Sequence, residues 1–321
     1  MVLINFIQTY SVENTFYSEG LSVLWSHVLL VKRYYNQGSL FTAHKSESDF
    51  MSYYLAGLIE GDGHFNTPKK LKTPSGTAKV AAIEVVFALK DRPSAEFLQS
   101  LFGGRLYDHP QKKISRWLIQ DKKSVTNIIN LINGKFRTPK INSLFEMIDF
   151  LNAKGDNIIK LPLDSSPLNS NAWLAGFIDA DGHFAIKGFT SNPKTYLAIH
   201  FQLGQRNTDK SGESLEKLML KIAEFLLVKL SKRVFSEKFH QFVINTSNPV
   251  SNKVLIDYLN TYPLLSSKYL DFKDWEAASN IYVHKLHKDP VQFEKIRNIK
   301  ANMNNNRTYF SWAHLELILS R

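Results

Sequence analysis

Residues 55–65 read LAGLIEGDGHF, and residues 174–184 read LAGFIDADGHF. Eight of the eleven positions are identical, and the other three exchange one apolar, acidic or small residue for another of the same kind. The two copies begin 119 residues apart, which is the size of an ordinary domain. The repeat therefore predicts two related domains in one chain, each placing an acidic residue at the same point near a pseudo-two-fold axis.

The order of elements that follows each copy also indicates a duplication. Alternation of apolar and polar residues predicts strands, and apolar residues at helical spacing predict helices. In the first half the motif forms the end of a helix, and after it strands are predicted at 64–71, 79–90, 105–109 and 114–120 and helices at 94–102, 123–132 and 140–152. In the second half, strands are predicted at 183–188, 195–205, 232–236 and 239–245, and helices at 172–181, 215–228, 251–259 and 265–283. Each half is therefore predicted to be an αββαββα domain of the α+β class.

Residues 154–170 are rich in Pro, Asp, Ser and Asn and lack periodicity, which is typical of a linker. We expect a leader at 1–48, a first domain at 49–155, a linker at 156–170, and a second domain with a C-terminal extension at 171–321. The leader contains an apolar run at 21–31, about half the length that spans a bilayer. Because it also lacks an early basic region and a clean cleavage site, we expect neither a membrane span nor a secretory signal.

The charge of the chain indicates a polyanionic partner. Its 321 residues include 40 Lys and Arg against 29 Asp and Glu, which gives a net charge of +11 and a sequence pI near 9.5. An excess of this size favours nucleic acid over a membrane surface as the partner. The chain has no cysteine, which excludes disulfides, thiolate metal sites and a cysteine nucleophile.

Small residues recur at helical spacing within both motifs: Gly57 with Gly61, and Gly176 with Ala180. Residues four apart lie on one face of a helix, and a face of small residues lets two helix backbones approach closely. We therefore expect the two motif helices to pack against each other and to join the two domains.

Asp62 and Asp181 come directly before Gly63 and Gly182, glycines that allow the left-handed backbone with which many helices end. The helix dipole is negative there and disfavours an aspartate by roughly 0.3–1 kcal/mol. If the helices pair, two carboxylates converge, and a cation relieves their repulsion. Oxygen ligands without a Cys or His cluster suit Mg²⁺ or another hard divalent ion. Such an ion activates water and stabilises phosphoryl transition states in many nucleases, so the motif predicts a metal-dependent hydrolase.

Each motif holds a second acid, Glu60 or Asp179, two residues before the first. This spacing places it on a different side of the helix from Asp62 or Asp181. We expect Glu60 and Asp179 to face solvent or the partner domain near the interface rather than to bind metal.

The predicted strand 195–205 (TYLAIHFQLGQ) has two different faces, because its odd-numbered positions from 197 to 203 are apolar whereas His200 and Gln202 point the other way. Polar side chains of this type read base edges, although a solvated sheet face explains them equally well. Basic residues on the other strands favour DNA, since they are able to contact phosphates while uncharged groups read bases. The candidate DNA-contacting residues are Lys79, Arg105, Arg116, Lys187, His200, Gln202, Lys232, Arg233 and Lys238.

With two such motifs, a repeated αββαββα order and basic strands, the chain resembles the LAGLIDADG homing endonucleases over roughly residues 50–285, specifically the single-chain type of organellar introns. The resemblance implies that each domain has a four-stranded antiparallel sheet that saddles the major groove of double-stranded DNA. It implies a monomer that cuts both strands of a long asymmetric target across the minor groove and leaves 3′ overhangs of four nucleotides. It also implies that Asp62 and Asp181, with the adjacent Gly61 and Ala180, form the site for the catalytic divalent ions, here expected to be Mg²⁺.

Three further catalytic positions follow from the resemblance. The family has a basic residue just after a short turn, which Lys268 matches in PLLSSK and Lys140 matches in FRTPK. It also has a glutamine at the end of the second strand, which Gln205 matches in FQLGQR. The first half reads FALKD there, so we expect Lys90 or Asp91 at the equivalent place and predict two half-sites that are not chemically equivalent.

Two other functions fit parts of the same pattern. An RNA-binding group I intron maturase, acting on its own intron RNA alone or in addition to cleavage, would use the same basic surfaces. A DNA-binding protein without nuclease activity is disfavoured, because both motif aspartates are present. A chain rich in Asn, Lys and Ile is typical of AT-rich genomes, and the family is organellar, so a mitochondrial location is expected, with the chloroplast as the alternative.

Overall fold

The computed structural model describes residues 45–188, 197–209, 211–236 and 239–319. Most of the predicted leader, residues 1–44, and the candidate DNA contact Lys238 therefore lie outside the described residues. The first motif helix, α2 (Lys45–Asp62), begins inside the predicted leader, so residues 45–48 belong to that helix. Within the described parts of the chain, no helix combines the length and the apolar character that crossing a bilayer requires.

Each half has the predicted order of elements, and each builds one four-stranded antiparallel sheet. In the first half, α2 is followed by β1 (Gly63–Asn66), β2 (Ala82–Ala88), α3 (Arg92–Phe102), β3 (Arg105–His109), β4 (Ile114–Ile119), α4 (Lys122–Ile132) and α5 (Ile141–Asn152). In the second half the order is α6 (Trp173–Asp181), β5 (Gly182–Lys187), β6 (Ala198–Arg206), α7 (Glu216–Phe225), β7 (Ser231–Ser236), β8 (Phe239–Thr246), α8 (Pro249–Thr261) and α9 (Lys268–Val283). The sheet orders, β1-β2-β4-β3 and β5-β6-β8-β7, correspond strand for strand, which confirms the predicted α+β fold.

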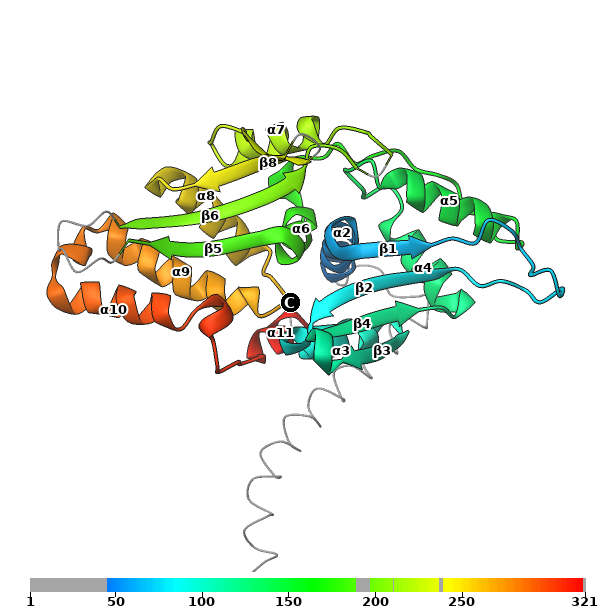
Figure 1. Ribbon diagram of the computed structural model, residues 1–321, viewed down its shortest axis with the longest axis horizontal. Coiled ribbons are helices and arrows are strands. Elements are labelled where there is room, and N and C mark those ends of the chain that lie inside the picture. Colours follow the sequence, from blue (N-terminus) through cyan, green and yellow to red (C-terminus); the bar gives the residue numbers. More distant parts are fainter. Residues whose placement is uncertain (1–44, 189–196, 210, 237–238, 320–321) are drawn as a thin grey trace, which may run out of the picture.

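The first two strands are shorter than predicted. β1 ends at Asn66 and is followed by Thr67 and Pro68, and proline is unable to donate to a strand ladder. The chain then forms a loop closed by an isolated bridge between Lys72 and Ala78 before β2 begins at Ala82. The sequence 67–81 therefore extends beyond the sheet, as Figure 1 shows between β1 and β2.

The two motif helices α2 and α6 lie side by side at the centre of the molecule, with one sheet on each side (Figure 1). Their glycines make this approach possible. A Cβ built on Gly57 would lie 2.0 Å from the carbonyl oxygen of Trp173, and one on Gly176 would lie 1.9 Å from the carbonyl oxygen of Tyr54. Since neither position admits a side chain, the predicted close packing of the motif helices is confirmed.

Gly63 and Gly182 are needed for a reason other than the predicted one. Gly182 has φ −76° and ψ 152°, which is extended backbone, and Gly63 also lies outside the left-handed region. A Cβ on Gly63 would lie 2.6 Å from the Cα atom of Ile59, and one on Gly182 would lie 2.7 Å from Cγ2 of Ile178. Each helix therefore passes directly into a strand, and the glycine provides room beside the preceding turn.

The predicted linker 156–170 is attached to the first domain. The side chain of Asn133 accepts from the backbone N–H of Leu161 at 3.1 Å and donates to the carbonyl of Ile159 at 2.7 Å. Arg137 forms a buried ion pair with Asp164 at 2.5 Å. The connection between the halves is therefore an ordered strap across the first domain.

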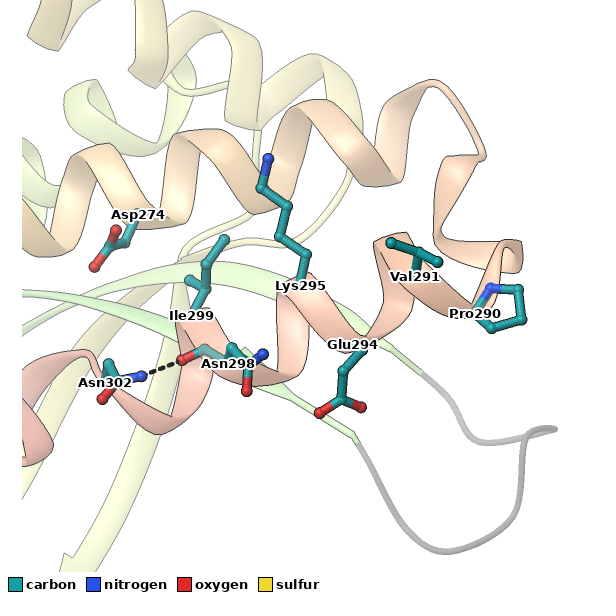
Figure 2. Close-up of a pocket in the computed structure, with 8 residues that line it drawn as sticks. All are labelled: Asp274, Pro290, Val291, Glu294, Lys295, Asn298, Ile299 and Asn302. Atoms are coloured by element: carbon teal, nitrogen blue, oxygen red, sulfur yellow. Dashed lines mark hydrogen bonds between the residues drawn. The ribbon is translucent and has the colours of Figure 1, made fainter.

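The C-terminal extension folds back over the second domain as α10 (Pro290–Ala301) and α11 (Ala313–Leu319). Arg307 links it to α9 by ion pairs with Asp271 at 2.7 Å and Asp274 at 2.6 Å. In Figure 1, α11 returns to the region between the two halves, near α3. An open groove lies between α9 and α10, and the eight residues that line it are drawn in Figure 2. None of those eight is a predicted site residue.

Candidate active site and DNA-facing sheets

Asp62 and Asp181 are the last residues of α2 and α6, so the packing of these helices decides where the two acids lie. At Gly61 a Cβ would lie 2.2 Å from Cβ of Ala180 and 3.1 Å from Oδ2 of Asp181. The C-terminal ends of the helices are therefore in contact, and the Asp181 carboxylate reaches across to the opposite helix. The predicted convergence of the two acids is present in the structure.

The two acids also influence each other electrostatically. Crowding by the surrounding protein and, next, the negative charge of Asp181 raise the pKa of Asp62 to about 6, although the residue keeps solvent contact. Lys268 and Lys140 oppose this rise through their positive charges. Asp62 thus has an environment in which a carboxylate is disfavoured unless positive charge is nearby.

Both predicted lysines reach the ends of the motif helices. Lys140 Nζ donates to the carbonyl of Ile59 at 2.9 Å and to that of Gly63 at 3.0 Å. Lys268 Nζ donates to the carbonyls of Asp179 at 2.5 Å and Ala180 at 2.7 Å. The last carbonyls of a helix lack partners within it and carry the negative end of its dipole, so each ammonium group stabilises its helix end. Burial lowers the pKa of Lys268, and the nearby aspartates oppose that shift.

Gln205 donates a hydrogen bond from Nε2 to Oδ2 of Asp181 at 2.7 Å. The first half holds a different residue at the corresponding place. Gly182 pairs with Leu203 and Gly63 pairs with Val85, so the equivalent of Gln205 is Phe87. The two half-sites are therefore chemically different, as predicted.

The prediction that Lys90 or Asp91 replaces the glutamine is wrong. Both residues lie in the short helix η1 (Leu89–Asp91) beyond the end of β2. Asp91 is buried and accepts the backbone N–H of Ser267 in the other domain at 2.7 Å. Strand register, which the sequence motif did not reveal, determines which residue faces the acid.

The donor atoms around the two acids suit a hard cation. They are the carboxylates of Asp62 and Asp181 and the carbonyl oxygens of Gly61 and Ala180, which also accept hydrogen bonds from the lysines at 3.5 and 2.7 Å. Among the described residues, no group of three or more His, Cys, Asp or Glu side chains gathers as a metal site. A cation at this place would therefore take its other ligands from water or from a bound phosphate.

The family profile described as LAGLIDADG endonuclease matches residues 55–151 and 174–279, which together cover more than half of the chain. The chain belongs to the LAGLIDADG endonuclease family. The intron-encoded DNA endonuclease aI3 of Saccharomyces cerevisiae is 31% identical over 307 residues, covering 85% of this chain and 74% of that protein. This LAGLIDADG protein is accordingly a DNA endonuclease of the homing type.

Two further relatives add to this picture. The intron-encoded RNA maturase bI4 of Saccharomyces cerevisiae is 32% identical over 155 residues, which are 48% of this chain and 21% of that protein. The crystal structure of the homing endonuclease I-LtrWI bound to target DNA has a TM-score of 0.62 and 19% identity, and covers 81% of this chain and 99% of that chain. The LAGLIDADG fold of two sheets around two motif helices is therefore shared across the whole double domain.

Most of the candidate DNA contacts of this LAGLIDADG endonuclease lie on one face of each sheet. Residues two apart on a strand share a face, and so do directly paired residues. The pairing of strands places Arg105 and Arg116 on the face of the first sheet opposite its buried core, and both are exposed. In the second sheet Lys187, Gln202 and Arg233 share the corresponding face.

Lys232 lies on the opposite face from Arg233, so it does not share a face with the other candidate DNA contacts of the second sheet. It pairs with Phe242 across the sheet, places Nζ 5.2 Å from the centre of that ring, and forms an ion pair with Glu216 of α7 at 3.0 Å. Neighbouring residues on a strand point to opposite faces, so the two basic residues are presented on different faces of the sheet. Lys79 lies half-buried in the loop before β2 rather than within a strand.

His200 is on the predicted polar face but is only 8% exposed. Burial and, after it, the positive charges of Lys187, His183 and Arg233 together lower its pKa to about 4. The ring is therefore neutral at neutral pH and is not offered to a ligand as the alternation suggested. By contrast, the buried apolar positions 197 to 203 of the same strand are as predicted.

Glu60 and Asp179 face the partner domain at the interface rather than solvent, which is one of the two predicted alternatives. They are 5% and 6% exposed, and each accepts hydrogen bonds from its own domain and from the other. Burial raises the pKa of Glu60 and the hydrogen bonds that it accepts partly oppose the rise, so that its pKa is about 7. The sequence offered one sign of a shared role for Glu60 and Asp179, because an acid stands at the same position in both motifs. Their hydrogen-bond partners could not be identified from the sequence, since these lie 77 to 125 residues away along the chain.

Proposed function

We propose that this endonuclease hydrolyses both strands of a long asymmetric double-stranded DNA target and leaves 3′ overhangs of four nucleotides. The observation that carries the proposal is the convergence of Asp62 and Asp181 at the ends of two packed helices. Each of those helix ends also receives a lysine, Lys140 or Lys268. Two matching sets of an acid and a lysine are what the cleavage of two strands requires.

The proposal includes Mg²⁺, with Asp62 and Asp181 as ligands and the carbonyl oxygens of Gly61 and Ala180 available beside them. The donor set consists of oxygen atoms, and the raised pKa of Asp62 reflects crowding and a repulsion that a divalent ion relieves. When bound, such an ion stabilises negative charge on a phosphate and lowers the pKa of water. The related I-SmaMI has been crystallised with uncleaved DNA target in the presence of calcium ions, which supports a hard divalent ion.

The remaining chemistry belongs to the side chains of this chain. Lys140 and Lys268 bring ammonium groups to the two acids, where they attract the scissile phosphates and stabilise the charge that develops on them. Gln205 holds one oxygen of the Asp181 carboxylate and so fixes its orientation. Since Phe87 replaces this glutamine in the first half, the two strands are cut with unequal rates.

The outer faces of the two sheets bind the DNA. Arg105, Arg116, Lys187 and Arg233 contact phosphates, and Gln202 reads base edges in the major groove. Arg116 is paired with Glu84 at 2.6 Å, so its guanidinium is oriented before DNA binds. Because the two faces carry different side chains, the target is asymmetric.

The experiment for this proposal uses the purified full chain and a library of randomised DNA duplexes. Sequencing both ends of every cut product should return one long asymmetric site, cut in both strands, with 3′ overhangs of four nucleotides. The same reaction in EDTA should give no cuts. Blunt ends, 5′ overhangs, cuts in one strand only, or undiminished cutting in EDTA would contradict the proposal.

One observation favours a second activity, binding of the chain's own group I intron RNA as a maturase. The observation is the similarity of part of the chain to the RNA maturase bI4. A splicing assay with Asp62→Asn tests maturase activity without DNA cleavage. The absence of splicing by both this variant and the wild type would exclude maturase activity.

We also propose a monomer, because both motifs lie in one chain, and a mitochondrial location, because one relative is named for a cox1 intron.

A further inference from the structure

The second acid of each motif holds the backbone of a loop that carries a lysine. Glu60 accepts the N–H of Arg137 at 2.9 Å and that of Thr138 at 2.6 Å. Asp179 accepts the N–H of Leu265 at 2.6 Å and that of Ser266 at 3.1 Å. These loops continue directly into the lysines of the active site, so each buried carboxylate fixes the loop from which its lysine extends.

The connection from loop to lysine is also the same in both halves. The Oγ1 atom of Thr138 accepts the backbone N–H of Lys140 at 3.2 Å, and the Oγ atom of Ser266 accepts that of Lys268 at 3.1 Å. The lysine side chains then return to the carbonyls at the end of the same motif helix. Each half therefore contains a closed chain of contacts that runs from acid to loop to lysine and back to the helix that carries the acid.

Each acid also takes a hydrogen bond from the other domain. Nε1 of Trp173 in α6 donates to Oε2 of Glu60 at 2.5 Å, and the hydroxyl of Tyr54 in α2 donates to Oδ2 of Asp179 at 2.5 Å. Tyr54 and Trp173 are equivalent residues, since each comes directly before its motif. The exchange is reciprocal, with each helix supplying one aromatic donor and one acidic acceptor.

We propose that Glu60 and Asp179 are positioning residues that place Lys140 and Lys268. The aromatic donors Trp173 and Tyr54 make this placement depend on how the opposite motif helix packs. The inference rests on the proposed roles of the two lysines in cleavage. Replacing the buried carboxylate by a neutral amide weakens the hydrogen bonds from the loop N–H groups and places an N–H group against the aromatic donor, which shifts the loop. A lysine on a shifted loop no longer reaches the acids, while the DNA-binding sheets are untouched.

The test is a double-mutant cycle that measures the cleavage rate with enzyme in excess over DNA. Glu60→Gln and Lys140→Ala should each slow cleavage by about tenfold or more. If Glu60 acts through Lys140, the combined variant should be no slower than Lys140→Ala alone. The matched control combines Glu60→Gln with Lys268→Ala in the other half, and there the two losses should multiply.

Three outcomes overturn the inference. Losses that multiply for Glu60 with Lys140 would show that the acid acts independently of its lysine. A parallel loss of DNA affinity, measured by titration in calcium, would show a general structural defect. Cleavage of DNA by Lys140→Ala at the wild-type rate would show that Lys140 has no role in cleavage. The failure of the proposed function is separate, because it appears as cutting by Asp62→Asn.

A variant that leaves both buried acids in place tests the inference even if those acids are required for folding. Tyr54→Phe removes only the hydroxyl that reaches Asp179 and keeps the ring, which stacks on Phe50 with centroids 5.9 Å apart. We expect slower cleavage with unchanged DNA affinity, and no additional loss when Tyr54→Phe is combined with Lys268→Ala. Cleavage at the wild-type rate by Tyr54→Phe would overturn the dependence on the opposite helix.

Discussion

Gln205 donates its side-chain N–H to Oδ2 of Asp181 at 2.7 Å, across the short distance between the end of β6 and the end of α6. The first half offers no equivalent, because strand register places Phe87 at that position. The two acids of the active site are therefore supported differently, although the motifs that carry them are almost identical. This asymmetry makes a direct prediction about the two strands of the DNA.

Gln205→Leu should slow cleavage at the half-site that uses Asp181 more than at the other. The substitution removes a hydrogen bond to a charged group, which corresponds to about tenfold or more in rate. The measurement follows each DNA strand separately with a different end label. The variant should accumulate nicked intermediate, and equal slowing of both strands would contradict the asymmetric role of Gln205.

Gly57→Ala and Gly176→Ala should each destabilise the protein by about 3 kcal/mol or more, because the added Cβ meets a backbone oxygen of the opposite helix at 2.0 or 1.9 Å. Thermal unfolding provides the measurement. Gly204→Ala is the matched control, since the nearest neighbour of its Cβ is the Gln241 side chain at 3.7 Å, and its stability should be close to that of the wild type. Equal stability of all three variants would mean that the helices do not pack this closely.

DNA affinity should fall steeply with salt, and Arg233→Ala should reduce the slope of log affinity against log salt by about one. Lys232→Ala is the adjacent control. It should leave that slope unchanged, because Lys232 lies on the helix-covered face beside Glu216. The contrast between two neighbouring basic residues tests which face of the second sheet meets DNA, and the reverse result would place the DNA on the other side.

His200 should make the protein less stable as the pH falls from about 6.5 towards 4. Its folded-state pKa of about 4 lies below the ordinary value of 6.5, so in this range the unfolded chain binds a proton that the folded protein does not. The contribution of His200 to the free energy of unfolding is fully present above pH 6.5 and is lost as the pH falls towards 4. In His200→Gln the melting temperature should change less over this window than in the wild type, and parallel curves for the two proteins would exclude the effect.

The parts of the fold that were predictable are those encoded locally. The repeated motif, with small residues four apart, predicted both the duplication and the packing of α2 on α6. The alternation of the strand 195–205 predicted the inner and outer faces of the second sheet. Such patterns depend on residues that are near one another in the sequence.

The features that could not be predicted depend on pairing between distant segments. Lys232 and Arg233 are equally basic, and only the register of β7 on β8 separates them. The replacement of Gln205 by Phe87 likewise required the register of β1 on β2. For Glu60 and Asp179 the sequence left solvent and the partner domain as alternatives, and only the placement of distant loops and aromatic donors in space decides between them.

We propose that Asp62 and Asp181 together form the site that cuts DNA. The most direct measurement compares cleavage of the target duplex, at saturating protein and in Mg²⁺, by the wild type, Asp62→Asn and Asp181→Asn, with the DNA affinity of each protein measured in parallel. Both variants should bind the target as tightly as the wild type and make no double-strand cut. Double-strand cutting at the wild-type rate by either variant would contradict the proposal.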